Sequence, residues 1–165
     1  MAVAKPAGKG ATEDISLDAA ASHLLEECRM VLPGIQALFG FQLIAVFNQG
    51  FGEKLSHGAQ LVHLLALVLT ALAMALVMTP AALHRLSEPR SVSERFVWMA
   101  SKMVLAGMVP LAIGVGLDAY VVASVVTAST GAGIVIGAAL LAVFAWLWFL
   151  LPRREHRRQG QARVP

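Results

Sequence analysis

Charged residues are scarce in this sequence. They make up 14% of its 165 residues, whereas hydrophobic residues make up 58%, and its mean hydropathy is +0.71. Soluble domains average about 25% charged residues, and a soluble domain of this size could not bury so much apolar surface. The composition therefore excludes an ordinary soluble domain and indicates a membrane protein.

Cysteine is almost absent, and so are the motifs of common enzymes. The single cysteine, Cys28, excludes an intramolecular disulfide and a cysteine-rich metal site. No Walker A motif, H-E-x-x-H or G-x-S-x-G occurs. Paired histidines can hold haem, but His63 and His84 would lie about 30 Å apart on one helix and cannot reach one iron. We therefore expect a protein that is not an enzyme, without catalytic, metal-binding or cofactor-binding residues.

Four apolar stretches dominate the rest of the sequence. They cover residues 30–47, 59–79, 98–125 and 133–151. A helix rising about 1.5 Å per residue needs about 20 residues to cross a hydrocarbon core of about 30 Å, and each stretch approaches or exceeds that length. We therefore predict an all-α fold, an integral membrane four-helix bundle, within a membrane domain that covers residues 16–152.

The segments that flank the four spans differ in character. Residues 1–15 are rich in Ala, Gly and Lys and predict a flexible cytoplasmic tail. Residues 16–29 carry apolar side chains at helical spacing behind a possible N-cap, Ser16. They predict an N-terminal amphipathic interfacial helix that runs into the first span near Pro33. Residues 153–165 predict a second cytoplasmic tail, which is basic.

The basic residues are distributed unevenly along the chain. Most lie between the second and third spans or after the fourth: Arg85, Arg90, Arg95, Lys102, Arg153, Arg154, Arg157, Arg158 and Arg163. The other two connections contribute only Lys54. Because cytoplasmic loops carry the excess of Lys and Arg, we predict a multi-pass protein of the bacterial inner (plasma) membrane with both termini in the cytoplasm. This topology accounts for the net charge of +3 without a nucleic-acid partner.

Four polar side chains fall within the apolar spans and are candidate functional residues. Gln36 and Gln42 lie in the first span, His63 lies about one turn inside the second, and Asp118 interrupts an apolar run in the third. An unsatisfied polar group in hydrocarbon is costly, so we expect both amides to face neighbouring helices. An ionisable group inside a span is by default a functional candidate, although Asp118 would lie near the outer end of its helix.

A second polar group is predicted at the cytoplasmic ends of the helices. Glu27 and Arg29 precede the first span, whereas His84 and Arg85 follow the second. We interpret these four side chains as a polar clamp between the two helices. The alternative is that each side chain simply reaches water and anchors its own helix.

Small residues in the fourth span predict a close helix contact. Gly133 and Gly137 form a small-x-x-x-small pair, which lets two helix backbones approach closely. The sequence leaves open whether this contact lies within the chain or between protomers. In the third span, Pro110 predicts a kink.

Two motifs and three aromatic residues resemble a family of small bacterial four-helix inner-membrane proteins known only as a domain of unknown function. They are residues 27–36 (E-C-R-M-V-L-P-G-I-Q), Phe39, Phe41, Phe51 and residues 80–85 (P-A-A-L-H-R). The resemblance covers about residues 24–125 and implies architecture more than activity. Some members have carried an automatic sodium:proton antiporter label, but four spans without evident inverted repeats are few for that task unless the chain oligomerises. Gln42 departs from the aliphatic residue associated with its position in the family.

Two functional hypotheses follow from these observations. The first, favoured by the glycine pair, is a protein that associates with itself or serves as an accessory subunit of a larger membrane complex. The alternative is a small oligomeric ion or proton transporter or channel that uses the four intramembrane polar side chains. Convergence of these side chains on a water-filled route would favour transport, whereas their separation on different faces of a dry bundle would favour association. Beyond the lipid bilayer, the sequence identifies no particular partner or ion.

Overall fold

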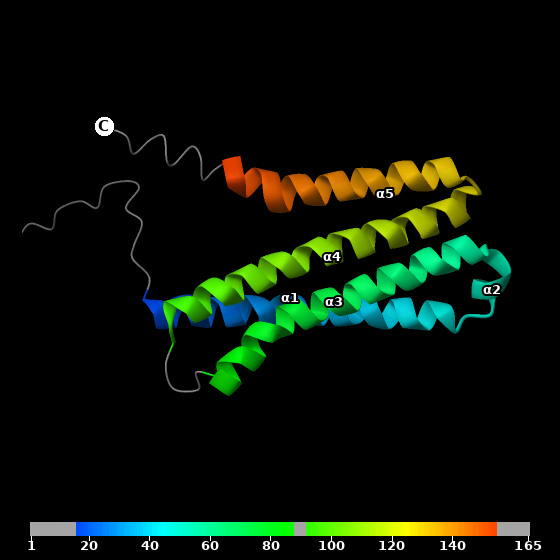
Figure 1. Cartoon of the computed structure of the whole chain (residues 1–165). Helices are drawn as coiled ribbons and strands as arrows, with labels where there is room; N and C mark the ends of the chain where they lie inside the picture. The colour runs from blue at the N-terminus through cyan, green and yellow to red at the C-terminus, as the bar shows by residue number, and fades with distance from the viewer. Residues whose placement is uncertain (1–15, 88–91, 155–165) are drawn as a thin grey trace, which may run out of the picture.

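The computed structural model describes residues 16–87 and 92–154, and these residues are almost entirely helical. The elements are α1 (Leu17–Val46), α2 (Gly50–Lys54), α3 (His57–Ser87), α4 (Glu94–Thr127), α5 (Thr130–Ala145) and a π-helical turn (Trp146–Leu150), as seen in Figure 1. Four helices are long and apolar enough to cross a membrane, the last being α5 with its continuation to Arg154. The predicted all-α class with four spans is therefore confirmed. The predicted N-terminal tail, and the basic tail beyond Arg154, lie outside the described residues.

α1 is one continuous helix that runs through Pro33 into the first span. Ser16 caps it, because its Oγ accepts a hydrogen bond from the Ala19 amide at 3.3 Å. Residues 16–29, predicted as a separate interfacial helix, form the first part of α1. A proline removes only one helical hydrogen bond and is tolerated where neighbouring helices support the backbone.

The continuity of α1 follows from the way it packs. Its buried side chains are Ala21, Leu24, Cys28, Ile35 and Gln42. They recur at intervals of three, four and seven residues, so they form one stripe that continues on both sides of Pro33. The same face of the helix therefore packs against α3 and α4 along its whole length.

α3 and α4 make the most extensive helix contact, because small residues face one another along them. A Cβ on Gly107 would lie 3.3 Å from the Ala73 carbonyl oxygen, and a Cβ on Gly114 would lie 3.1 Å from the Ala66 carbonyl oxygen. Both alanines are completely buried. The close approach at these two positions fixes the register of the antiparallel pair.

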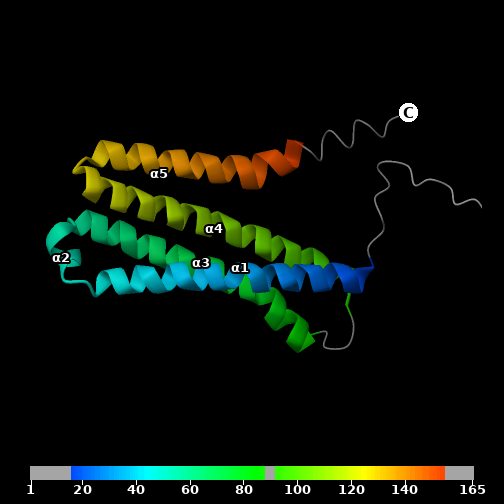
Figure 2. The same cartoon turned by 180° about the vertical axis from the view of Figure 1, so that it is seen from behind.

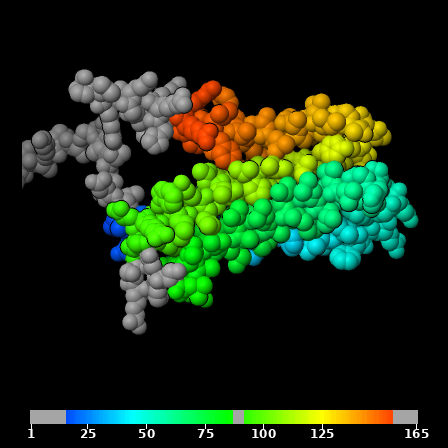
Figure 3. Space-filling view, viewed as in Figure 1, coloured from blue at the N-terminus to red at the C-terminus, as the bar shows by residue number. Residues whose placement is uncertain are grey.

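α5 packs chiefly on α4 and forms an outer layer of the described part of the molecule. Figures 1 and 2 show it on the side of α4 away from α1, and the space-filling view in Figure 3 shows it running along one edge. The chain turns between the two helices at Ala128, whose φ is 50°, and the Ser129 side chain caps α5. Among the described residues, α5 has no extensive contact with α1 or α3. The four helices therefore form an open bundle.

The two ends of this bundle differ. One end holds α2, and we call it the α2 end. At the opposite end, which we call the terminal end, α1 begins and α5 finishes (Figure 1). The last part of α3 bends away from the other helices at the terminal end (Figure 2). Pro80 lies in α3 and is fully buried, and proline is a common cause of such bends. α4 continues without interruption through Pro110, where the sequence predicts a kink.

Candidate functional site

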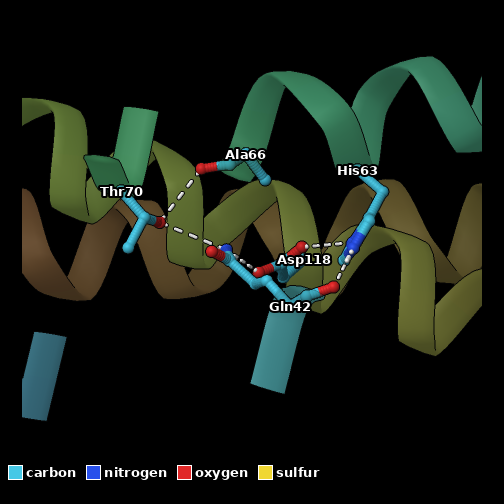
Figure 4. Close-up of polar contacts among 5 residues, drawn as sticks. All are labelled: Gln42, His63, Ala66, Thr70 and Asp118. Carbon is cyan, nitrogen blue, oxygen red and sulfur yellow. Dashed lines mark hydrogen bonds and ion pairs between the residues drawn. The ribbon is translucent and has the colours of Figure 1, made fainter. Parts of the chain in front are cut away.

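Four polar side chains meet between α1, α3 and α4, near the α2 end of the bundle (Figure 4). Three of them, Gln42, His63 and Asp118, were candidates from the sequence, and the fourth is Thr70. We call these four residues the polar network. Gln42, His63 and Thr70 are buried, with exposed fractions of 4%, 7% and 0%, respectively.

The helix contact described above explains why these residues meet. Asp118 follows Gly114 by one helical turn on α4, and His63 precedes Ala66 by about one turn on α3. Because Gly114 packs against Ala66 and the helices are antiparallel, Asp118 and His63 are brought side by side. Gln42 reaches them from the buried stripe of α1.

The hydrogen bonds of His63 determine which ring nitrogen carries its hydrogen. Nε2 lies 3.0 Å from the backbone carbonyl oxygen of Gln42. A carbonyl oxygen only accepts hydrogen bonds, so Nε2 must donate. Nδ1 lies 3.0 Å from Oδ1 of Asp118.

The contact between His63 and Asp118 therefore requires a shared proton. With the proton on Nδ1, an imidazolium faces a carboxylate, and with the proton on Oδ1, a carboxylic acid donates to a neutral imidazole. Both arrangements fit the same geometry. The pair is thus able to hold one proton and to pass it between two atoms without moving a helix.

Gln42 and Thr70 hold the other side of the carboxyl group. The Gln42 amide nitrogen donates one hydrogen to Oδ2 of Asp118 at 2.5 Å and the other to Oγ1 of Thr70 at 3.1 Å. Thr70 in turn donates to the Ala66 carbonyl oxygen at 3.0 Å. These bonds reduce the cost of placing a carboxyl group inside a membrane-spanning bundle. Oε1 of Gln42 is buried and has no hydrogen-bond partner.

An apolar groove leads to the polar network from the α2 end. It has a volume of about 350 Å³ and is lined by Phe41, Phe51 and Val122, among others, together with His63 and Asp118. The edge of the Phe51 ring packs against the His63 ring, with 5.3 Å between the ring centroids. The Asp118 side chain remains 18% exposed. The carboxyl group is therefore the member of the network that is open to the groove.

On the other side of the network, toward the terminal end, the bundle is closed. Ile35, Ala73 and Val77 are all buried there, and Ile35 and Val77 belong to the hydrophobic core. The polar groups thus lie at the bottom of an access route that opens at one end. They do not form a continuous polar path through the bundle.

Gln36 does not join the network, and the expectation that it faces a neighbouring helix is wrong for the single chain. Its side chain is exposed on the outside of α1. Its neighbour Ile35 belongs to the buried stripe, and successive residues in a helix point about 100° apart. The register that buries Ile35 and Gln42 therefore turns Gln36 outward.

The predicted clamp is only partly assembled. Arg29, His84 and Arg85 line one crevice between α1 and α3, at the terminal end, whereas Glu27 is exposed and does not line it. Within residues 16–87 and 92–154, no hydrogen bond or ion pair joins these four side chains. The His84 ring packs against Phe96, with 5.4 Å between the ring centroids. The clamp consequently has no direct polar contact to hold it together.

The glycine pair of α5 contacts α4 within the same chain. A Cβ on Gly137 would lie 2.9 Å from the Gly116 carbonyl oxygen, and a Cβ on Gly133 would lie 2.7 Å from the Tyr120 carbonyl oxygen. Both glycines are buried. This resolves the question that the sequence leaves open, because the close approach is intramolecular.

Thr70 is the functional residue that the sequence analysis missed. It lies seven residues after His63, two helical turns further along α3, and therefore on the same face. That spacing could have indicated that Thr70 faces the same site as His63. It is a weak signal, because the hydroxyl group of a threonine in an apolar helix usually donates a hydrogen bond to the backbone of its own helix. Among the described residues, no group of three or more His, Cys, Asp or Glu side chains is placed to hold a metal ion.

Comparison with known proteins gives a family but no characterised relative. Neither a curated protein nor a solved structure is significantly similar to this chain. One family model matches residues 10–152, which is most of the chain and includes every member of the polar network. The chain therefore belongs to the Family of unknown function (DUF6328).

Proposed function

We propose that this membrane protein moves protons, as a small transporter or channel, and that His63 and Asp118 form its proton-binding site. The observation that carries the proposal is the partly buried contact between Nδ1 of His63 and Oδ1 of Asp118, which needs one shared proton. Ionisable residues within membrane spans are costly and commonly mark proton or ion pathways. The groove gives Asp118 access to one end of the bundle.

The polar network also extends the site along the membrane normal. From His63 to Thr70, α3 rises about 10 Å, and the hydrogen bonds of Gln42 join the two levels. The packed residues beyond Thr70 close the site toward the terminal end. We interpret this arrangement as one state of the protein, in which the proton-binding site exchanges protons only with the solution at the α2 end.

We further propose that the protein lies in a bacterial inner membrane with both termini in the cytoplasm and that it is not an enzyme. The concentration of Arg and Lys in the 84–102 segment and after the fourth span supports this orientation. This orientation is also supported by the fold, because α1 begins and α5 finishes at the terminal end of the bundle (Figure 1). In this orientation, the groove faces the periplasm, and no nucleic acid is a partner.

Association is the second candidate function, as a homo-oligomer or as an accessory subunit. The glycine pair no longer supports it, because α4 occupies that surface. The exposed Gln36 does support it, since an amide in hydrocarbon gains from a partner on another chain. Replacing Gln36 by Leu should then reduce the oligomeric mass measured in detergent, whereas an unchanged mass would contradict association through this surface.

Proton flux in proteoliposomes is the test of the proposed function. The purified chain is reconstituted with a pH-sensitive dye inside the vesicles, and a potassium diffusion potential drives proton entry. Asp118→Asn is the informative variant, because an amide can keep the bonds to Gln42 and His63 but cannot carry the proton. We expect it to lower flux at least tenfold, whereas Glu26→Gln, which changes an exposed carboxyl group, should leave flux unchanged.

Two outcomes would contradict the proposal. If wild-type flux is no higher than that of empty vesicles, the transport proposal is refuted and association becomes the favoured function. Equal flux in wild type and Asp118→Asn would show that any transport does not use this site. The same vesicles with a sodium gradient determine whether sodium is coupled to the proton.

A further inference from the structure

The crevice between α1 and α3 lies at the opposite end of the bundle from the polar network and has no part in proton binding. It has a volume of about 860 Å³. The first part of α1 forms one wall and the bent last part of α3 forms the other. Its lining changes from basic at the rim to apolar further in, and this gradient indicates what it binds.

The basic rim consists of Arg29 on α1 and Arg85 on α3, with His84 beside them. Both guanidinium groups are exposed. In the part of the chain that the structure describes, neither makes a hydrogen bond or an ion pair. Two arginines that share a crevice and have no carboxylate partner form a site for an anion, and guanidinium groups match the geometry of phosphate.

His84 adds an unsatisfied polar group at the same place. Its ring lines the crevice, and its Nδ1 is buried and has no hydrogen-bond partner among the residues that the structure describes. The nearby acidic residue Glu27 is exposed and does not line the crevice. Among the described residues, the lining therefore contains basic side chains and no carboxyl group.

The inner part of the crevice is apolar. Leu32, Val77 and Met78 form it, and the lining reaches as far as Ala75 on α3. From Arg85 to Ala75, α3 rises about 15 Å, which is half of a hydrocarbon core of about 30 Å. The apolar wall is thus as deep as one leaflet of a bilayer.

Neighbouring aromatic residues place the basic rim at the level of the lipid headgroups. Trp98 and Trp146 lie near the terminal ends of α4 and α5, and tryptophan is enriched at the membrane–water interface. The ammonium group of Lys102 lies 3.7 Å from the centre of the Trp98 ring, and the Arg154 guanidinium lies 4.4 Å from that of Trp146. Phosphate groups of the bilayer are at this depth.

We propose that the crevice binds one anionic phospholipid from the leaflet at the terminal end. Its phosphate contacts the guanidinium groups of Arg29 and Arg85, and an acyl chain lies against the apolar wall between α1 and α3. A free phosphate ion would use the rim but leave the apolar wall without a ligand. The continuity of rim and wall therefore favours a lipid.

Native mass spectrometry of the delipidated full chain in detergent tests this proposal. The probes are phosphatidylglycerol, phosphatidylcholine with the same acyl chains, and inorganic phosphate. We expect one phosphatidylglycerol to bind at least tenfold more tightly than phosphatidylcholine. The double variant Arg29→Gln/Arg85→Gln should lose this tenfold preference, whereas Arg95→Gln, an exposed arginine at the same end that does not line the crevice, should keep it.

Three results would overturn the lipid site. Equal binding of the two lipids would show that the headgroup charge is not recognised. Wild-type binding by the double variant would place the lipid elsewhere on the protein. Displacement of phosphatidylglycerol by an equal concentration of inorganic phosphate would show that the rim binds a free anion and that the apolar wall contributes nothing. Both substituted arginines are exposed, so the variants are expected to fold.

Discussion

The shared proton predicts that His63 and Asp118 depend strongly on each other for stability. Replacing His63 by Leu leaves the Asp118 carboxyl group with Gln42 as its remaining donor, beside an apolar groove. Breaking a buried pair in this way costs about 3 kcal/mol. Replacing Asp118 by Leu leaves both Nδ1 of His63 and one amide hydrogen of Gln42 without a hydrogen-bond partner, which costs about 2 kcal/mol.

The double variant should be much less destabilised than the sum of the two single variants. With both side chains replaced, two losses remain. One amide hydrogen of Gln42 has lost its acceptor, and the hydrogen bond from Nε2 of His63 to the Gln42 carbonyl oxygen is gone, while new apolar contact offsets part of both. We therefore expect the double variant to lose about 2 kcal/mol and the pair to show a coupling energy of about 3 kcal/mol. Single hydrogen bonds between membrane helices average about 0.6 kcal/mol in such cycles.

Equilibrium unfolding in mixed detergent micelles, followed by far-ultraviolet circular dichroism, measures all four proteins of this cycle. A control cycle combines His63→Leu with Gln36→Leu, and it should be additive because the Gln36 side chain is exposed and lies outside the network. A coupling energy below about 0.5 kcal/mol between His63 and Asp118 would refute the reasoning. The two residues would then be neighbours that do not share a proton.

Two further predictions concern the helix contacts. Gly137→Leu should destabilise the protein by at least about 2 kcal/mol, because the new side chain would meet the backbone of Gly116. Gly34→Leu is the control and should not destabilise it, because a Cβ at Gly34 would have no neighbouring atom within 4 Å. Equal thermal unfolding of the two variants would contradict the internal α4–α5 contact. Arg85→Ala should change the unfolding free energy in lipid-free detergent by less than about 0.5 kcal/mol, since Arg85 is exposed and makes no hydrogen bond or ion pair within residues 16–87 and 92–154. The clamp hypothesis requires a clear loss of stability in the same measurement, so a loss above about 1 kcal/mol would restore it.

The sequence predicted the helices well because hydrophobic length and end signals are local properties. The four spans follow from runs of apolar residues, and the predicted cap at Ser16 uses a side chain next to the helix that it begins. The sequence did not predict how far the buried stripe of α1 continues beyond Pro33, because that stripe depends on packing against other helices.

The sequence predicted Gln42, His63 and Asp118 as separate candidates but did not predict that they meet at one site. Gln36 and Gln42 are both glutamines, both lie in α1, and both have mainly hydrophobic neighbours in the sequence. They lie six residues apart and so point about 120° apart around the helix, and one is exposed while the other is buried. Which of them faces inward depends on how α1 is rotated against α3 and α4, and no property of α1 alone determines this rotation.

The distribution of small residues also determines which helix can move. α3 and α4 are locked by backbone contacts at Gly107 and Gly114, where even a methyl group would lie 3.1–3.3 Å from a carbonyl oxygen. α1 meets this pair through a single stripe of side chains, and its membrane-spanning part is only 11% buried. His63 and Asp118 both belong to the locked pair, so their proton contact persists when α1 shifts. Under the proposed transport function, a path from Asp118 to the terminal end would therefore open where Ile35 of α1 packs, by movement of α1 and not by separation of α3 from α4.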